Sequence, residues 1–442
     1  MKKTILLICL FLGHFYHLVS QSTTVKGHVS SKDDTKGIPY VSVGISNTSI
    51  GIICDEFGNF VLQVPGQYLQ DSLFFSCVGY STIKSKIDGS KPMNIALSSK
   101  LYLLPEVMIF PYLSAEEILE KVKQKMGDNF YQNIYKQQGI FTSTSFRDGQ
   151  CVGFTQMKLD IFNRGFDWSY TELPTMYVST TDLINVKEQR KSTYFYGKDI
   201  RGLKEEGKFY DWLNIVKEDI LHKGFLVKGK SKSVVKIVDT TMYNNEVVYV
   251  LRCEPSASLL KKINKTPLAF FPIHTGLYEA EFYVNAKNYA IHKVVFSTKK
   301  YTTLYKVLKN EQDFKAKWNY IEGVILYEPY QGKYFPKYIS YDESFLDKNA
   351  STEEEINITK KNQLVLTDLG EISGSLDAYK KEFGFEIDKE GNIKRQKPKV
   401  NEVFNPTFWE KIPLDLYLSK QSQNNLESQA NEPLENQFKK VK

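Results

Sequence analysis

The chain has 442 residues, of which 42% are hydrophobic, 14% aromatic and 25% charged. This composition is typical of a folded protein of roughly two or three domains, and it argues against a mainly disordered chain. The formal net charge is +7, and pairs such as Lys299-Lys300 and Lys360-Lys361 are interspersed with acids elsewhere in the chain. This pattern indicates a mixed, solvated surface, so no nucleic-acid partner is expected.

Residues 1–20 have the pattern of a secretory signal peptide. Met1-Lys2-Lys3 gives a positive start, Thr4–Val19 is an apolar run, and cleavage is expected after Ser20. No later stretch is long and apolar enough to span a bilayer as a helix. We therefore expect an exported chain, in the periplasm or associated with the outer membrane, that is at most peripheral to a membrane.

Residues 21–100 show the two-residue period of short β-strands. Two sets of alternating apolar residues mark buried strand faces: Val41, Val43 and Ile45, and then Phe60, Leu62 and Val64. Between the sets, Gly58 can adopt the positive φ of a hairpin loop, and Asp55 can accept hydrogen bonds from nearby backbone amides. A structural turn is preferred here over a calcium site, because one short turn offers too few oxygens. The pattern predicts a small β-sandwich.

The same stretch resembles a known family. The resemblance is carried by Val25–Val29, Gly37–Val43, Gly51–Phe60 and Phe75–Tyr80. In this order they resemble the carboxypeptidase-regulatory-like domain, with Cys54 where a Thr is usual. The resemblance implies a transthyretin-like β-sandwich of the kind that often stands at the N-terminus of exported or outer-membrane proteins of Gram-negative bacteria. It implies no peptidase activity.

A domain boundary is expected at residues 101–113, where Pro105 and Pro111 flank an extended apolar segment. Ser114 and Glu117 then form a capping box that opens a helix over Glu116–Met126. Its apolar stripe predicts packing in a core. The stripe consists of Ile118, Leu119, Val122 and Met126. A second helix is expected near Phe209–Leu221.

Beyond the helix at Glu116–Met126 the period of two returns. Alternating runs flank turn signals at Asp148-Gly149, Asn244-Asn245 and Ala286–Tyr289, and another pair flanks a loop that holds Gly332. Consecutive hairpins predict one large curved antiparallel sheet with helices packed on one face, which makes residues 114–418 an α+β domain.

This second region also resembles exported proteins in which the regulatory-like module precedes a large β-rich domain. The resemblance is carried by Ser114–Leu119, Gly139–Phe141, Gly153–Gln156, Leu159–Phe162, Tyr283–Asn285, Tyr289–Ile291 and Phe408-Trp409. Those proteins bring no settled activity. At the level of fold alone, the hairpins are also similar to the curved sheets of periplasmic lipoprotein carriers.

The end of the chain changes in composition. Residues 419–442 are polar, rich in Gln, Asn and Glu, and lack an apolar period, so a disordered tail is expected. Phe408-Trp409 is expected to dock the last ordered segment. Four cysteines follow the signal peptide, and each lies singly in an expected strand, which predicts free, buried thiols. They are Cys54, Cys77, Cys151 and Cys253, and Cys54–Cys77 is the pair expected if a bridge forms.

No familiar catalytic motif is present. After the signal peptide no histidine has an acid three residues on, and no two histidines are near one another, so neither a zinc carboxypeptidase nor a thermolysin-like motif is found. A Gly-x-Ser-x-Gly elbow, a phosphate-binding loop and a dinucleotide fingerprint are also missing. We therefore expect no cofactor, no metal and no catalytic residue.

Two weaker groups of residues stand out. Glu279 and Glu281 share one strand face, as the carboxylates of a glycosidase would, although the solvated side of an amphipathic strand is favoured. A candidate recognition surface for sugar rings or for a protein is formed by aromatic residues and one histidine, with core packing as the favoured alternative. Its members are His274, Tyr327, Tyr330, Tyr334 and Phe335.

We interpret the chain as a non-catalytic binding or assembly protein of the bacterial cell envelope. Its expected partner is an outer-membrane or surface protein, or a polysaccharide, recognised through sheet surface and loops. The alternative is an envelope hydrolase acting on glycans, with carboxylates that come together only in the folded chain. A deep pocket with two facing acids favours the hydrolase, and a flat or grooved aromatic surface favours binding.

Overall fold

The computed structural model describes residues 22–100, 113–132, 135–163, 184–193, 233–263, 279–304, 317–348, 355–369, 381, 385–387, 393–395 and 404–440. The expected signal peptide, nearly all of the expected linker, the helix expected near Phe209–Leu221 and the residue His274 lie outside the described residues. Among the described helices, none has the length and the apolar composition needed to cross a membrane.

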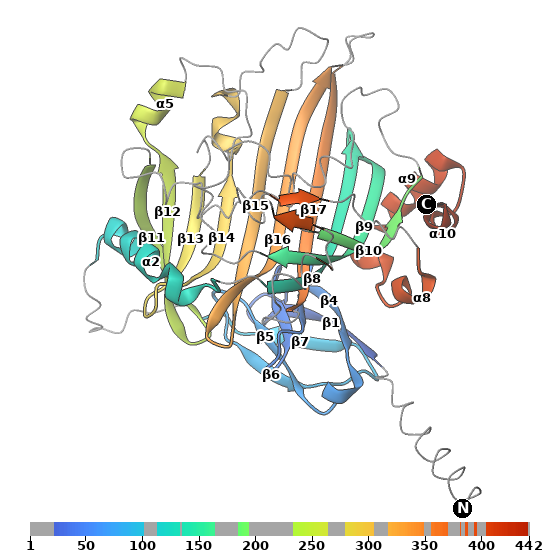
Figure 1. Cartoon of the computed structure of the whole chain (residues 1–442), viewed down its shortest axis with the longest axis horizontal. Helices are drawn as coiled ribbons and strands as arrows, with labels where there is room; N and C mark the ends of the chain where they lie inside the picture. Colours follow the sequence, from blue (N-terminus) through green and yellow to red (C-terminus); the bar gives the residue numbers. More distant parts are fainter. Residues whose placement is uncertain are drawn as a thin grey trace, which may run out of the picture.

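Residues 22–100 form the predicted β-sandwich, drawn in blue in Figure 1. One sheet has the strand order β4-β1-β7 and the other has the order β3-β2-β5-β6. The strands are β1 (Thr23–Ser31), β2 (Ser42–Ile45), β3 (Gly51–Ile53), β4 (Asn59–Val64), β5 (Ser72–Ser76), β6 (Ile83–Lys86) and β7 (Met93–Leu97). The alternating apolar residues meet in the core, where the rings of Phe60 and Phe75 pack edge to face with centroids 5.6 Å apart.

The turn between β3 and β4 confirms the structural interpretation of Asp55. Its Oδ1 accepts hydrogen bonds from the backbone N–H groups of Phe57 (2.9 Å) and Asn59 (2.8 Å). Gly58 has φ +85°, a conformation that glycine adopts without strain. The Asp55 carboxylate thus closes the turn.

The described residues of the second region are dominated by one antiparallel sheet of ten strands in the order β10-β9-β8-β17-β16-β15-β14-β13-β12-β11. Figure 1 shows it as a broad curved layer above the sandwich, as the hairpin pattern predicts. The strands are β8 (Tyr135–Arg147), β9 (Gln150–Asn163), β10 (Ile184–Lys191), β11 (Ser233–Tyr243), β12 (Glu246–Pro255), β13 (Glu279–Asn285), β14 (Ile291–Ser297), β15 (Lys317–Tyr330), β16 (Lys333–Lys348) and β17 (Glu355–Leu369).

The predicted hairpin turns are confirmed. Both residues have positive φ in each of the turns Asp148-Gly149, Asn244-Asn245 and Gln331-Gly332. Such turns match the right-handed twist of the flanking strands. The hairpin pattern does not predict β17, which pairs with β16 on one side and with β8 on the other. Lys360 and Asn362 interrupt its apolar alternation, yet both side chains are buried in the sheet.

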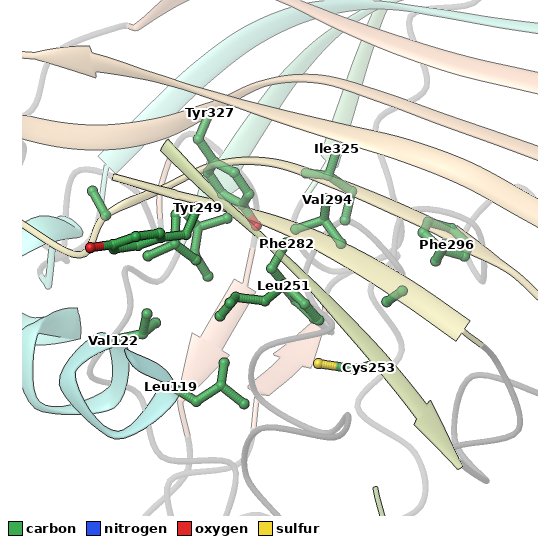
Figure 2. Close-up of a cluster of buried hydrophobic side chains, with 14 of the residues drawn as sticks. Leu119, Val122, Tyr249, Leu251, Cys253, Phe282, Val294, Phe296, Ile325 and Tyr327 are labelled. Atoms are coloured by element: carbon green, nitrogen blue, oxygen red, sulfur yellow. The ribbon is translucent and has the colours of Figure 1, made fainter. Parts of the chain in front are cut away.

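Helix α2 (Ala115–Asn129) begins with the predicted capping box. Ser114 Oγ accepts a hydrogen bond from the N–H of Glu117, and Glu117 Oε2 accepts one from the N–H of Ser114. Its apolar stripe packs on the sheet, as Figure 2 shows for Leu119 and Val122 beside Leu251. The helix therefore covers the main core rather than offering an open groove. This core also contains Cys253, Phe282, Val294, Phe296, Ile321 and Ile325.

The predicted disorder of residues 419–442 is wrong for the described part of that tail. Residues 420–439 form helices α9 (Lys420–Ala430) and α10 (Leu434–Lys439), which pack beside β9 and β10 (Figure 1, red). Three widely spaced apolar side chains are buried against Cys151 and Phe154, namely Leu426, Leu434 and Phe438. Gln437 is also buried, and its amide donates to the carbonyl of Glu432 (2.8 Å) and accepts from the N–H of Thr193 (3.0 Å). The segment is polar in composition but ordered, because its buried amide is hydrogen-bonded to other protein groups.

A buried arginine anchors the end of the chain to the sheet. Arg190 of β10 donates to Gln156 Oε1 through Nε (2.9 Å) and to the carbonyl of Ile412 (3.0 Å). Its guanidinium carbon lies 4.6 Å from the ring centroid of Trp409, which is buried as the docking prediction requires. Burial lowers the pKa of Arg190 to about 10. The stacked guanidinium holds the C-terminal segment through contacts that lysine cannot reproduce.

The remaining described elements are short. They are η1 (Gly66–Tyr68), α5 (Ala257–Ile263), η3 (Lys299–Leu304), β18 (Phe385–Ile387), β19 (Ile393–Arg395), α8 (Pro406–Trp409) and η4 (Leu414–Leu416). β18 pairs with β19. The four cysteines in the described ranges are free thiols, with Cys77 half-buried and the other three buried.

The two edges of the large sheet differ. The β10 edge lies beside α10, whereas β11 pairs only with β12 among the described strands. Val234, Ile237 and Val238 of β11 are each more than 40% exposed. A register shift between Ile237 and Asp239 leaves Val238 as a bulge residue. Within the described residues, the β11 edge is therefore apolar but irregular.

We predict that Leu426→Ala lowers the free energy of unfolding by about 2–5 kcal/mol, because it removes a fully buried side chain from the core beneath the C-terminal helices. Asn424→Ala, at an exposed position of the same helix, is the matched control and changes stability little. Urea denaturation of both variants and the parent measures the difference. Equal stability of the Leu426 variant and the parent would mean that the tail does not pack on the sheet.

Candidate functional site at the domain junction

The sandwich docks on the sheet through a small apolar patch. Ile53 of β3 packs against Tyr338 of β16 and Val365 of β17. The backbone of Tyr40 has φ +60°. The centroid of its ring lies 5.5 Å from the ring centroid of Tyr338. Figure 1 shows the sandwich at the lower end of the sheet, where these strands end. The patch fixes which sandwich loops face the sheet.

The β11–β12 hairpin adds polar contacts to this junction. The Oδ1 of Asn244 accepts hydrogen bonds from Ser76 (2.8 Å) and Thr82 (2.7 Å) of the sandwich. Next to it, the N–H of Gly79 donates to the carbonyl of Met242 (2.8 Å). The turn residue Asn244 therefore serves both the hairpin and the docking of the two domains.

A cavity begins where β16 and β17 part. The two strands pair from Lys348↔Glu355 as far as Tyr338↔Val365. Beyond this point β16 continues with β15 to their turn, while β17 continues with β8. The carbonyl of Pro336, left at the split, accepts a hydrogen bond from the buried amide of Gln137 (3.1 Å). The sandwich loop that holds Ser49 covers the gap between the strands.

Irregularities in both strands direct charged side chains toward Ser49. Tyr338 and Pro336 of β16 pair with two consecutive residues of β15. Lys337, which lies between them, is therefore an extra residue in β16. In β17 a similar shift lies next to Asp368. Such bulges redirect side chains, and proline in a strand is typical of them.

Ser49 binds both charged groups. Its carbonyl accepts a hydrogen bond from Lys337 Nζ (2.9 Å), and its hydroxyl donates to Asp368 Oδ1 (2.5 Å). The same hydroxyl accepts from the N–H of Leu369 (3.3 Å). One sandwich residue therefore links β16 to β17 where their own ladder has ended.

The resulting junction cavity has a volume of about 350 Å³. Both domains contribute to its lining. The residues are Asn47, Thr48, Ser49 and Phe74 of the sandwich, and Gln137, Glu328, Pro329, Tyr330, Gln331, Phe335, Pro336, Lys337, Leu366, Asp368 and Leu369 of the sheet. The lining thus combines amides, charged groups and aromatic rings, the mixture that binding sites for small polar molecules use.

Burial affects two charged residues of the junction cavity. Burial raises the pKa of Glu328, against the lowering effect of Lys337. Burial likewise lowers the pKa of Lys337, against the raising effects of Glu328 and Asp368. Glu328 Oε1 has no hydrogen-bond partner among the described residues. Groups held in this way can bind a polar ligand strongly, because few waters compete for them.

The structure separates the residues of the expected recognition surface. Tyr330 and Phe335 line the junction cavity, and Phe335 is itself packed against Tyr135 at 5.1 Å between ring centroids. Tyr327 and Tyr334 are buried in the main core around Phe130, at 5.4 and 6.2 Å. These two form no open platform, in keeping with core packing, and His274 lies outside the described residues.

Sequence reasoning missed Ser49, Lys337 and Asp368. These residues are far apart in the chain, and none of them belongs to a motif. The one local signal was Pro336 inside an otherwise alternating strand, which marks a bulge and thus a redirected neighbour.

The carboxylates Glu279 and Glu281 lie on a solvated, ion-paired face of the sheet. Glu281 pairs with Arg252 at 2.6 Å, and Lys300 lies 3.7 Å from Glu279. These contacts confirm the favoured interpretation of an amphipathic strand. Within the described ranges, no three His, Cys, Asp or Glu side chains are grouped to hold a metal ion.

A further carboxyl lies in a cross-strand row on the same sheet. Asp342 stands between Glu322 on β15 and Lys361 on β17 in the strand register. Burial raises its pKa to about 6, with Glu322 adding to the effect and Lys361 opposing it. Because the folded-state pKa exceeds the ordinary value of 3.8, ionising Asp342 costs folding free energy. Its contribution to stability is therefore lost as pH rises through 4 to 6.

We predict that Asp342→Asn raises the free energy of unfolding at pH 7 by roughly 1–2 kcal/mol, and that the gain disappears below about pH 4. Chemical denaturation across this pH range measures the effect. Asp71→Asn, at an exposed position, is the control and shows no such gain. A variant at Asp342 that is no more stable than the parent at pH 7 contradicts the raised pKa.

Comparison with known proteins agrees with the description of the N-terminal region. Residues 25–109 match the family model of the CarboxypepD_reg-like domain. The chain therefore carries this domain ahead of a large β-rich region, as the sequence resemblance implies. Among curated proteins, none matches the sequence.

Several solved structures are similar to larger parts of the chain. A DUF1329 family protein from Desulfovibrio piger is 11% identical, with 60% of this chain and 96% of that chain covered and a TM-score of 0.27. A LolA superfamily protein from Nitrosomonas europaea is 11% identical, with coverages of 60% and 99% and a TM-score of 0.18. A protein of unknown function from Bacteroides fragilis is 8% identical, with coverages of 80% and 99% and a TM-score of 0.15. At these TM-scores the superpositions are loose.

Proposed function

We propose that this chain is a binding protein of the bacterial cell envelope that holds a glycan in the junction cavity. The observation that carries the proposal is the cavity itself, whose 350 Å³ falls in the range of sites for small organic ligands. The envelope location is supported by the secretory pattern of residues 1–20. An outer-membrane or surface protein as a second partner stays a prediction.

The lining of the junction cavity suits the chemistry of a sugar. A sugar ring carries many hydroxyls, each of which donates and accepts hydrogen bonds, and a flatter face of C–H groups. Lys337 Nζ can donate and the carboxyl of Asp368 can accept, while the amide of Gln331 can do both. The half-buried ring of Tyr330 offers an apolar surface that ends in a hydroxyl.

The same lining supports a second candidate function, that of a glycan hydrolase. Glu328 and Asp368 both line the junction cavity, and burial raises the pKa of Glu328. Glycosidases use a pair of carboxyl groups in which the surroundings raise the pKa of one member. However, Asp368 accepts a hydrogen bond from the Ser49 hydroxyl at 2.5 Å, which reduces its reactivity as a base or nucleophile. Binding is therefore the preferred function.

We predict that oligosaccharides from peptidoglycan, lipopolysaccharide or capsule include one that binds the purified chain, as measured by saturation-transfer NMR and calorimetry. Lys337→Met and Tyr330→Ala should each weaken this binding at least tenfold, because each removes a group that lines the junction cavity. Lys333→Met is the matched control. Its Nζ donates to the carbonyls of Gly127 and Asp128 outside the cavity, so binding should be unchanged.

Three outcomes decide between glycan binding and glycan hydrolysis. They apply to variants whose melting temperatures show that they are folded. Binding that is lost in the two cavity variants and kept in the control supports the proposal. The absence of binding to every oligosaccharide, or equal binding by all variants, contradicts it. Release of reducing ends that is abolished by Glu328→Gln and Asp368→Asn would replace it with the hydrolase.

A further inference from the structure

A second and much smaller cavity lies in the same junction. Its volume is about 20 Å³, which is room for about one water molecule. Ser42 of β2, His292 of β14 and Glu328 of β15 contribute to its lining, so both domains enclose it. Glu328 lines this cavity and the larger one, and therefore stands between them.

Three buried polar atoms of these residues have no hydrogen-bond partner within the described part of the chain. They are Ser42 Oγ, His292 Nδ1 and Glu328 Oε1. Most buried polar atoms in proteins are hydrogen-bonded to protein or to ordered water. Three unpartnered atoms from three strands that line one cavity therefore point to an occupant that serves all of them.

The proton of His292 can be placed from its neighbours. The Oδ1 of Asn285 accepts hydrogen bonds from the N–H groups of Lys287 (2.8 Å) and Asn288 (3.1 Å), which fixes the orientation of the amide. The Nδ2 of Asn285 then donates to Nε2 of His292 at 3.3 Å. A nitrogen that accepts carries no proton, so the neutral ring carries its proton on Nδ1. Burial lowers the pKa of His292 to about 4, which keeps the ring neutral at pH 7.

This tautomer restricts the chemistry of the occupant. Nδ1–H is a donor, so it requires an acceptor and cannot bind a metal cation. Glu328 Oε1 is an acceptor, and the Ser42 hydroxyl can act in either direction. A water molecule both accepts and donates and fits about 20 Å³.

We propose that one ordered water occupies the small cavity, accepts a hydrogen bond from His292 Nδ1–H, donates one to Glu328 Oε1 and bonds to the Ser42 hydroxyl. The water joins the sandwich to two strands of the sheet through atoms that have no hydrogen-bond partner among the described residues. It also donates a hydrogen bond to one oxygen of Glu328, the residue that lines both cavities. This inference stands independently of the glycan proposal, because it concerns only the small cavity.

A high-resolution crystal structure of the unchanged chain and ¹⁵N NMR of its histidines test the proposal. We expect one density peak at hydrogen-bond distance, about 2.7–3.2 Å, from all three atoms. At pH 7 the ¹⁵N shifts of His292 should be those of the Nδ1–H tautomer, and this proton should show a cross-peak to a long-lived water. In Glu328→Gln, which keeps an acceptor oxygen, the peak should persist, and in Glu328→Leu it should vanish.

Four results would overturn the proposal. The first is an empty cavity, and the second is a direct hydrogen bond between His292 and Glu328 or Ser42. The third is a proton on Nε2 of His292. The fourth is a peak at the shorter distances, about 2.0–2.4 Å, of a metal ion. Each of these is observable without any variant.

Discussion

The architecture depends on the end of one hydrogen-bonded ladder. β16 and β17 cease to pair at Tyr338 and Val365, and backbone groups beyond that point need other partners. One of these groups, the N–H of Leu369, donates to the Ser49 hydroxyl. Ser49 also binds two side chains there, through its carbonyl for Lys337 and its hydroxyl for Asp368. The sandwich is thus tied to the sheet at the place where the sheet itself is incomplete.

The same geometry explains why the cavities lie where they do. Two strands that separate leave a space that their own side chains do not fill, and a rigid sandwich cannot follow the curvature of the sheet at every point. The apolar contact of Ile53 with Tyr338 holds the two surfaces together, while polar residues contribute to the lining of the two cavities. A molecule bound as proposed in the junction cavity would therefore touch residues that also dock the two domains.

Local signals predicted most of the fold but little of the site. The capping box at Ser114, the paired turn residues and the alternation in the sandwich each act within a few residues, so they can be recognised in the sequence. The approach of Lys337 and Asp368 to Ser49 depends on register shifts and on the insertion of β17 between β16 and β8, which no local pattern encodes. The prediction of a disordered tail failed for a related reason. The amino-acid composition does not distinguish a buried amide, such as that of Gln437, from a solvated one.

Among the described strands, β11 lies at one edge of the sheet, which has a consequence for how the protein behaves at high concentration. An open strand with aliphatic side chains is a template on which another chain can add a strand, and repeated addition leads to fibrils. Here Lys236 places a charge beside Ile237, and the bulge at Val238 breaks the even spacing of the backbone groups. An incoming strand would therefore lose hydrogen bonds at the bulge and bury a lysine. The irregularity of β11 therefore disfavours edge-to-edge aggregation.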